Sequence, residues 1–258
     1  MSDNTDSLLI RQLNISRQSK SLISLTELRV KPGEVATIVG PSGSGKSTLL
    51  RWVLGEPLHD FNASGELWLG GKRMDKEPIE RRQIGLMYQK GDLFPHLTVL
   101  QNLLFALPRV GKAEQRQRAE QALQAVGLQH KRTAMPDELS GGEQSRIALI
   151  RSLLAEPEAI LLDEPFSALD EFTRSEMQKW LLDIWQSNKR SILFVTHNIE
   201  EALFLADRIL VLSEKPARVV AEFQVEFTRP RAEDITLTEE FLQYKKDIYK
   251  VLKKGTGE

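Results

Sequence analysis

The chain has 258 residues, of which 41% are hydrophobic and 28% charged, and its formal net charge is −1. This length suffices for one large α/β domain or for a core with a small insert, and the charge gives no general attraction to nucleic acid or anionic lipid. The absence of cysteine excludes disulfides and thiolate metal sites. No apolar run approaches the roughly 18 residues of a membrane-spanning helix. The polar start Met1–Ser7 lacks the apolar core of a signal peptide, so we expect a cytosolic protein.

The first third of the chain predicts strands followed by a phosphate-binding loop. Residues 8–15 and 22–30 alternate partly between apolar and polar and predict two short strands. After a turn, the apolar run Val35–Val39 predicts a buried strand, and an apolar-periodic helix begins at Lys46. The segment between them reads GPSGSGKS, which fits the pattern GxxxxGK[ST] in its strand–loop–helix context.

This loop has the chemistry to hold a nucleotide. Its glycines let backbone N–H groups turn inward around an anion, and the following helix adds the positive end of its dipole. The ammonium of Lys46 can reach the β- and γ-phosphates, the Ser47 hydroxyl can ligate Mg²⁺, and Thr48 steadies the helix start. The predicted nucleotide-binding residues are Gly40, Pro41, Ser42, Gly43, Ser44, Gly45, Lys46, Ser47 and Thr48.

The chain then changes from strands to helices. Residues 65–74 predict a hairpin around Gly70–Gly71, and residues 83–89 predict a buried strand. With the two earlier strands, this pattern favours an antiparallel edge beside a parallel sheet. Apolar spacing over 97–107 and 114–126 predicts a helical insert, after which Leu139–Glu143 opens a helix with Ser140 as its N-cap.

The second half supplies the carboxylates that a phosphate-loop enzyme needs. The apolar strand 159–162 ends in Asp163, which can ligate Mg²⁺, and Glu164, which can polarise the water that attacks the γ-phosphate. Such a base contributes roughly 10²–10⁴-fold to the rate. Further elements are expected at 171–187, 192–195, 200–205, 208–212 and 239–252. We expect four segments, at 1–91 (strands and the first half of the core), 92–154 (helical), 155–212 (the second half of the core) and 213–258 (a short extension).

One ordered set of motifs makes the class specific. It comprises Gly40–Thr48, Gln89, Leu139–Glu143, Ile160–Pro165, Ser167–Asp170 and His197. This set resembles the nucleotide-binding subunit of an ABC transporter over about residues 8–212, and LSGGE is the discriminating stretch because other phosphate-loop families lack it. The resemblance implies an α/β P-loop NTPase fold with a RecA-like parallel sheet core, an antiparallel β subdomain and a helical insert.

The resemblance also implies roles for single residues. Gln89 would sense Mg²⁺ and the attacking water, and His197 would contact the γ-phosphate of ATP. The helix start formed by Ser140, Gly141, Gly142 and Glu143 would be a second anion site. Because the helical insert separates this site from the phosphate loop, two subunits arranged head to tail would each close the other's ATP.

Two residues depart from the family pattern. Arg17 occupies the place of the aromatic residue that stacks on adenine. A guanidinium can also stack on a ring, but Arg17 fits equally well as an exposed strand residue. Glu143 stands where glutamine is commoner, a change that the family tolerates.

Stretches at 166–185, 195–216 and 227–231 are similar to the nitrate/sulfonate/taurine importer ATPases. We therefore expect an ATP-hydrolysing importer subunit at the cytoplasmic face of the membrane, for a small solute such as one of these anions. Its partners would be a second ATPase subunit, permease subunits and a periplasmic or extracellular solute-binding protein, without nucleic acid. Residues 91–95 and 97–104 could receive a permease helix or make an internal contact. An exporter ATPase and a non-transport ABC ATPase are the alternatives.

Overall fold

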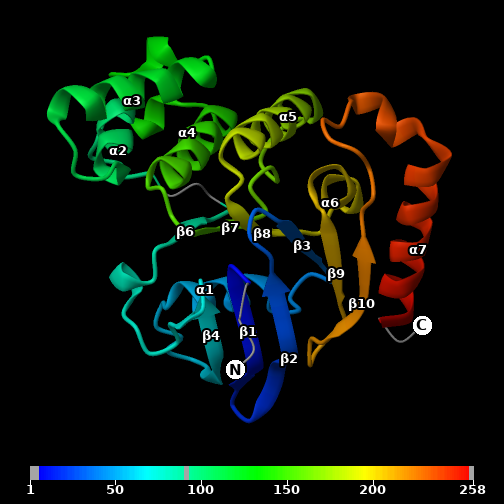
Figure 1. Ribbon diagram of the computed structural model, residues 1–258. Coiled ribbons are helices and arrows are strands. Elements are labelled where there is room, and N and C mark those ends of the chain that lie inside the picture. The colour runs from blue at the N-terminus through cyan, green and yellow to red at the C-terminus, as the bar shows by residue number, and fades with distance from the viewer. Residues whose placement is uncertain (1–5, 90–92, 256–258) are drawn as a thin grey trace.

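The computed structural model describes residues 6–89 and 93–255. Residues 1–5 of the polar start, and Gly91 and Asp92 of the expected permease groove, lie outside the described residues. Within the described part the chain forms two sheets and a separate group of helices (Figure 1).

The first sheet is antiparallel and contains most of the strands near the start of the chain. Its order is β2-β1-β4-β5, with β1 at Leu8–Arg17, β2 at Lys20–Val30, β4 at Asn62–Leu69 and β5 at Lys72–Arg73. The pairing of β1 with β4 shifts between Arg11 and Asn14, and Gln12 there has a φ of 49°. This bulge explains why the alternation in the sequence is only partial. Leu8 and Ile10 lie at even positions and Leu13 and Ile15 at odd positions, and the extra residue at the bulge lets all four side chains face the same core.

The second sheet carries the candidate site and is mostly parallel. Its order is β10-β9-β3-β8-β7-β6, with β3 at Val35–Val39, β6 at Ile84–Met87, β7 at Ala159–Asp163, β8 at Ser191–Thr196, β9 at Arg208–Leu212 and β10 at Val219–Gln224. Strands β3, β7, β8 and β9 are buried throughout, as their continuous apolar runs predict. The expected antiparallel strands beside a parallel sheet are confirmed, and the early strands form a sheet of their own. The antiparallel edge strand is β10, which the sequence analysis missed.

Helices cover both faces of the second sheet. Helix α1, at Lys46–Leu54, lies between the two sheets and contributes Leu49, Leu50 and Val53 to their shared core. The opposite face carries α5 at Glu171–Asn188, α6 at Ile199–Leu205 and α7 at Glu239–Gly255 (Figure 1). Trp180 and Trp185 of α5 pack against this core.

A helical unit stands at one end of the molecule. It contains α2 at Val99–Ala106, α3 at Lys112–Ala125 and α4 at Gly141–Leu154, which share a hydrophobic cluster of their own. Short 3-10 turns lie at Ile79–Arg81, Gln129–Lys131, Pro136–Glu138 and Glu233–Leu237. Helices α2 and α4 both begin with a capping box, from Thr98 and from Ser140.

The segment after β9 is fixed to the core by β10, α7 and two arginines. Arg229 donates to the Leu205 carbonyl at 2.6 Å, and Arg231 donates to the carbonyls of Leu203 and Phe204 at 3.0 and 2.9 Å. These three carbonyls belong to the last turn of α6, which has no further helical partners for them.

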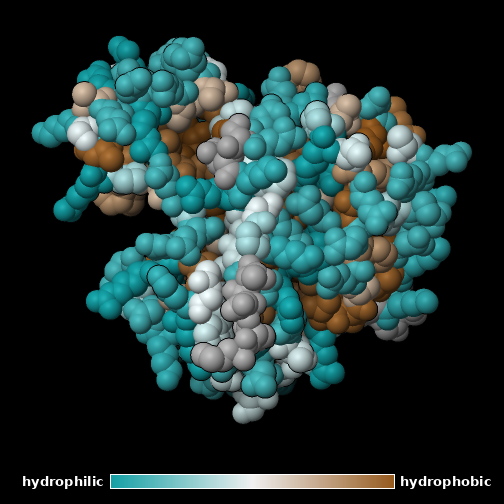
Figure 2. Space-filling model, in the orientation of Figure 1, coloured by the Kyte–Doolittle hydropathy of each residue, from teal (hydrophilic) through white to brown (hydrophobic). Residues whose placement is uncertain are grey.

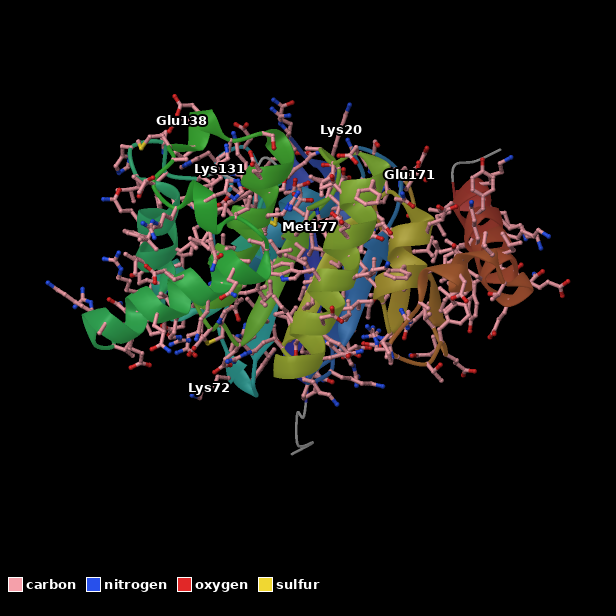
Figure 3. All side chains as sticks on the ribbon, turned by 90° about the horizontal axis from the view of Figure 1, so that it is seen from above. Lys20, Lys72, Lys131, Glu138, Glu171 and Met177 are labelled. Atoms are coloured by element: carbon pink, nitrogen blue, oxygen red, sulfur yellow. The ribbon has the colours of Figure 1, made fainter. Side chains whose placement is uncertain are left out.

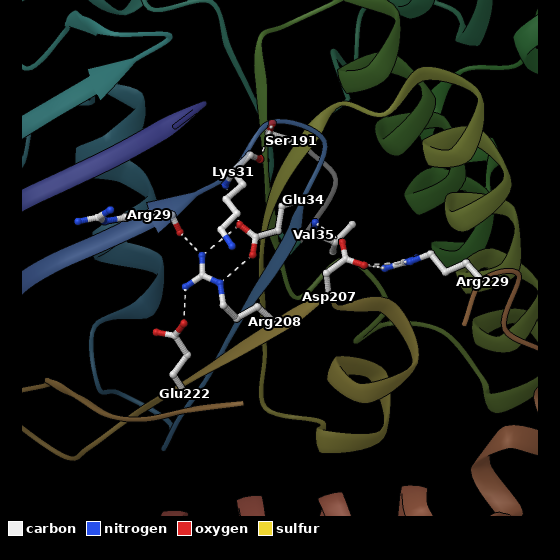
Figure 4. A network of polar contacts seen from close by, with 9 residues as sticks. All are labelled: Arg29, Lys31, Glu34, Val35, Ser191, Asp207, Arg208, Glu222 and Arg229. Carbon is white, nitrogen blue, oxygen red and sulfur yellow. Dashed lines mark hydrogen bonds and ion pairs between the residues drawn. The ribbon is translucent and has the colours of Figure 1, made fainter. Parts of the chain in front are cut away.

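A buried ion pair joins the two sheets (Figure 4). The Arg208 guanidinium on β9 donates to the Glu34 carboxylate at 2.7 Å, and the two side chains are 6% and 8% exposed. Arg208 also donates to the Arg29 carbonyl of β2 at 2.6 Å and to Glu222 of β10 at 3.1 Å. Removing one partner of such a pair would leave an uncompensated buried charge.

Candidate functional site

The predicted phosphate loop connects β3 to α1 and leaves the helix start open. Gly45 precedes α1 with a φ of 102°, and a Cβ on it would lie 3.0 Å from Leu22 and Ile23 of β2. A glycine is therefore required on both conformational and steric grounds. No side chain caps the first N–H groups of α1, so they remain available to an anion.

Two buried polar side chains of the loop have the character of ligand-binding groups. The Lys46 side chain is nearly buried, and its ammonium donates to the carbonyls of Gly40 and Pro41, both at 2.8 Å. Burial lowers the pKa of Lys46, while Glu164 and Asp163 act in the opposite direction. The Ser44 hydroxyl is buried without a hydrogen-bond partner among the described residues. An unpaired buried hydroxyl costs free energy, and a phosphate oxygen would supply the missing partner.

The predicted Mg²⁺ ligands meet at the end of β7. Asp163 is 7% exposed and accepts a hydrogen bond from the Ser47 hydroxyl at the start of α1. Burial is the largest cause that raises the pKa of Asp163, and the neighbouring Glu164 raises it further, while the Ser47 hydrogen bond and the charge of Lys46 act in the opposite direction. A hydroxyl beside a buried carboxylate fits a divalent cation that keeps several waters and binds phosphate oxygens.

Glu164 and His197 form a close pair at the ends of neighbouring strands. The Glu164 Oε2 atom lies 3.1 Å from His197 Nδ1 and 3.4 Å from Gln89 Nε2, which donates to it. Glu164 has a φ of 46°, an uncommon value for a side chain other than glycine, and its N–H donates to the Val195 carbonyl at 2.9 Å. Glu164 and Gln89, predicted to act on the attacking water, thus lie together with His197, predicted to contact the γ-phosphate.

A cavity of about 820 Å³ extends from this loop to the β1–β2 turn. Its lining includes Ser42, Lys46, Ser47, Gln89 and Glu164, which were predicted, together with Arg17. The Arg17 guanidinium is 59% exposed, lies 5.7 Å from the centre of the Phe61 ring and pairs with Asp60 at 3.6 Å.

Sequence reasoning missed several residues that line the far end of this cavity. They are Gln18, Lys20, Ser21, Leu22, Phe61 and Lys215. Phe61 could have been noticed as an aromatic residue in a polar stretch between α1 and β4, whereas Lys215 arrives through the pairing of Ala217 with β2, which no local pattern shows.

The other predicted anion site lies outside this cavity. Ser140, Gly141, Gly142 and Glu143 are absent from its lining. The Ser140 hydroxyl accepts from the Glu143 N–H at 3.3 Å, and the Ser140 N–H donates to the Glu143 carboxylate at 2.8 Å. This backbone hydrogen bond, more than any other contact, lowers the pKa of Glu143. The start of α4 is therefore an ordered helix terminus that faces solvent.

Most of this chain is similar to known ATP-binding proteins. Residues 24–167 match the family described as ABC transporter. A nitrate import ATP-binding protein of Synechocystis sp. is 40% identical over 235 residues, which cover 88% of this chain and 86% of that protein. An aliphatic sulfonates import ATP-binding protein of Bacillus subtilis is 37% identical over 214 residues, covering 83% and 81%.

Solved structures agree with the sequence relatives. An ATP-binding cassette bound to ADP and Pi, solved as a dimer in a post-hydrolysis state, superposes with a TM-score of 0.73 at 28% identity and covers 86% of this chain and 100% of its own. The P-loop NTPase fold and the cassette architecture predicted from the motifs are thereby confirmed. With its motifs in order, its loop built for phosphate and these matches along most of its length, the chain belongs to the ABC transporter family.

Proposed function

We propose that this protein is the subunit that binds and hydrolyses ATP to power a membrane importer of a small solute. The observation that carries this proposal is the pairing of Glu164 with His197, beside a buried lysine in a phosphate loop. A carboxylate held 3.1 Å from an imidazole is positioned to orient and activate water, while the phosphate loop supplies the anion site next to it.

Each part of an ATP molecule has residues in the cavity that suit it. The phosphates would displace the Gly40 and Pro41 carbonyls from the Lys46 ammonium and would pair with the unsatisfied Ser44 hydroxyl. Ser47 and Asp163, with Gln89 nearby, would hold Mg²⁺, which supplies charge neutralisation at the phosphates. At the far end, the Arg17 guanidinium and the Phe61 ring offer flat surfaces for a base.

Two copies of the chain would complete the site. Figure 3 shows Lys20, Glu138 and Glu171 along one edge of the molecule, and Lys72 at the opposite edge. Lys20 lines the cavity, Glu138 lies just before the Leu139–Glu143 stretch that opens α4, and Glu171 begins α5. The cavity mouth and the start of α4 therefore face the same side. A two-fold axis on that side would bring Ser140–Gly142 of one subunit onto the phosphates of the other. The related cassette was solved as a dimer, which supports this arrangement.

A permease would dock beside the helical unit. No helix in the described ranges is long and apolar enough to cross a bilayer. The Phe105 residue of α2 is 70% exposed, and its ring packs edge-on against the Phe94 ring with the two ring centroids 4.7 Å apart. Figure 2 shows hydrophobic surface in the hollow next to the helical unit. Leu93, by contrast, packs against two internal hydrophobic clusters. The proposed permease-docking surface therefore rests on Phe94 and Phe105.

The proposed solute class follows from the relatives. Proteins named for nitrate import and for aliphatic sulfonate import are 40% and 37% identical to this chain, which supports an importer of a small oxyanion at the cytoplasmic face of the membrane. Purification of the native complex tests the direction of transport: a co-purified solute-binding protein and permease support import, and a permease without a binding protein supports the exporter alternative.

Glu164→Gln tests the hydrolytic role. The variant keeps the shape of the side chain but not its basicity, so we expect ATP binding to persist, hydrolysis to fall by about 10²–10⁴-fold, and an ATP-dependent dimer to accumulate in light scattering. Glu176→Gln, on an exposed position of α5, is the matched control and should hydrolyse ATP at the parental rate. Parental hydrolysis by Glu164→Gln would remove Glu164 as the base.

A further inference from the structure

We propose that Arg174 and Glu201 are positioning residues that couple the turn between Glu164 and Asp170, close to the start of α4, to the Glu164–His197 pair. Arg174 lies in the second turn of α5, and Glu201 lies in the first turn of α6. The inference rests on the proposed dimeric ATPase and concerns how one subunit would relate its two anion sites.

Arg174 holds the turn that follows Glu164. Its guanidinium donates to the Leu169 carbonyl at 2.8 Å and to the Phe166 carbonyl at 3.4 Å. Both carbonyls lie between Glu164 and Asp170, and the Asp170 side chain caps α5 by accepting from the Thr173 N–H at 3.0 Å. One side chain thereby fixes the main chain of this turn at two points.

Glu201 holds the segment that carries His197. Its carboxylate accepts from the Thr196 hydroxyl at 2.7 Å, and the same hydroxyl accepts from the Asn198 N–H at 3.0 Å. Thr196 and Asn198 flank His197 in the chain. Because the carboxylate holds the Thr196 hydroxyl, and this hydroxyl holds the Asn198 N–H, a shift of Glu201 would move the imidazole relative to Glu164.

An ion pair joins these two arrangements. The Arg174 Nε atom lies 3.5 Å from Glu201 Oε1, and the Glu201 side chain is 7% exposed. Burial raises the pKa of Glu201, which means that its charge is costly at this place. Since apolar residues of similar volume often serve stability as well as a buried ion pair does, stability alone does not call for one here.

The connection continues to the start of α4. A Cβ on Gly142 would lie 3.4 Å from Leu169 and 3.7 Å from Thr173, so the start of α4 lies close to the turn held by Arg174. Gly142 thus lies near Leu169, and from Leu169 polar contacts lead through Arg174 and Glu201 to Thr196, the neighbour of His197. A nucleotide of the partner subunit at Gly142 would thereby bias the geometry of the catalytic pair.

A double-mutant cycle on the full chain tests this coupling. Arg174→Met, Glu201→Gln and the double variant are compared with the parent in steady-state ATP hydrolysis. We expect each single variant to lower kcat by about 10-fold with KM within about 2-fold, since nucleotide contacts are untouched. The double variant should also lose about 10-fold, rather than the roughly 100-fold of independent effects. The Hill coefficient for ATP should fall toward 1 in all three.

The Glu34–Arg208 pair provides the matched control. It is also an arginine–glutamate pair with a buried carboxylate, but its side-chain hydrogen bonds in the described part of the chain go to Arg29, Lys31 and Glu222 and not to His197 or Gly142. Glu34→Gln should lower the unfolding midpoint while keeping the Hill coefficient. If Glu201→Gln fails to fold, Thr196→Val leaves the ion pair in place, breaks its link to His197, and should give the same fall in kcat and cooperativity.

Two results would overturn the coupling. One is multiplicative loss of kcat in the double variant, and the other is unchanged cooperativity in a folded single variant. Both differ from failure of the proposed function, which would appear as absent ATP hydrolysis or absent cooperativity in the parent protein itself.

Discussion

The two candidate anion sites of this chain are built in opposite ways. The phosphate loop has a buried ammonium, an unsatisfied buried hydroxyl and a cavity of about 820 Å³ around it. The start of α4 is capped by its own Ser140 and Glu143, is open to solvent and lies outside that cavity. The first site can therefore capture a nucleotide within one chain, whereas the second can act only on a ligand presented from outside. This difference predicts that substitutions in the phosphate loop abolish ATP binding, whereas substitutions at the start of α4 abolish ATP-dependent dimerisation.

Lys46→Ala should have the largest effect, because it removes the only described cation inside the phosphate loop. Charge-assisted hydrogen bonds to two phosphates contribute about 3–6 kcal/mol together, so we expect ATP affinity to fall by at least about 10²-fold in a titration. Lys72→Ala, at the opposite edge of the molecule in Figure 3, should bind ATP as the parent does. Unchanged affinity in Lys46→Ala would contradict the phosphate-loop assignment.

Gly141→Asp addresses the second site. A Cβ there meets nothing within 4 Å, and an acidic residue in the first turn favours a helix, so the fold should be kept. The new charge would repel a phosphate presented by the partner by about 1–3 kcal/mol, which corresponds to roughly 5- to 150-fold weaker ATP-dependent dimerisation. Equilibrium binding of ATP to the monomer should not change, and Gly141→Ala should dimerise normally. Dimers of parental stability from Gly141→Asp would remove α4 from the interface.

Phe61→Ala sharpens the account of the far end of the cavity. Stacking of a base on an aromatic ring contributes about 1–3 kcal/mol, so KM for ATP should rise by about 5- to 150-fold while kcat changes by less than about 2-fold. Phe61→Tyr should restore KM because it keeps the ring. Arg17→Lys keeps the charge without the flat guanidinium, and a raised KM there separates stacking from simple exposure.

The smallest expected effect is the pH dependence of the α4 cap. The folded-state pKa of Glu143 lies below its ordinary value of 4.5, so the stabilisation is complete above that value and is lost as the pH falls through the lower folded-state pKa. We expect the free energy of unfolding to fall by about 0.3–1 kcal/mol between about pH 6 and pH 3, measured from the shift of the urea unfolding midpoint. Glu143→Gln keeps the hydrogen-bonding shape and should flatten this slope. An unaltered slope in that variant would mean that other carboxylates cause it.

The sequence revealed the parts of this protein whose determinants are local. The glycines and Lys46 of the loop, the Ser140 cap and the carboxylates after β7 each depend on residues within a few positions, and the structure has them where the pattern predicts. Strand β10 was missed because only its alternate residues are partly buried, which reads as a polar stretch until β9 is known to lie beside it. Lys215 was missed for a similar reason, because it reaches the cavity through the pairing of Ala217 with β2, whereas Phe61 had a local signal as an aromatic residue in a polar stretch.

The hydrogen bonds from Arg229 and Arg231 to the last turn of α6 have a practical consequence. Truncation of the protein after β9 would remove the hydrogen-bond donors of the three main-chain carbonyls in α6. It would also expose the edge of β9 that pairs with β10. Such a shortened protein would tend to self-associate, and its lost activity would say nothing about regulation. Any role of the final segment is better probed by single changes on the outward side of α7, for example at Leu242 or Tyr249, which are 43% and 54% exposed.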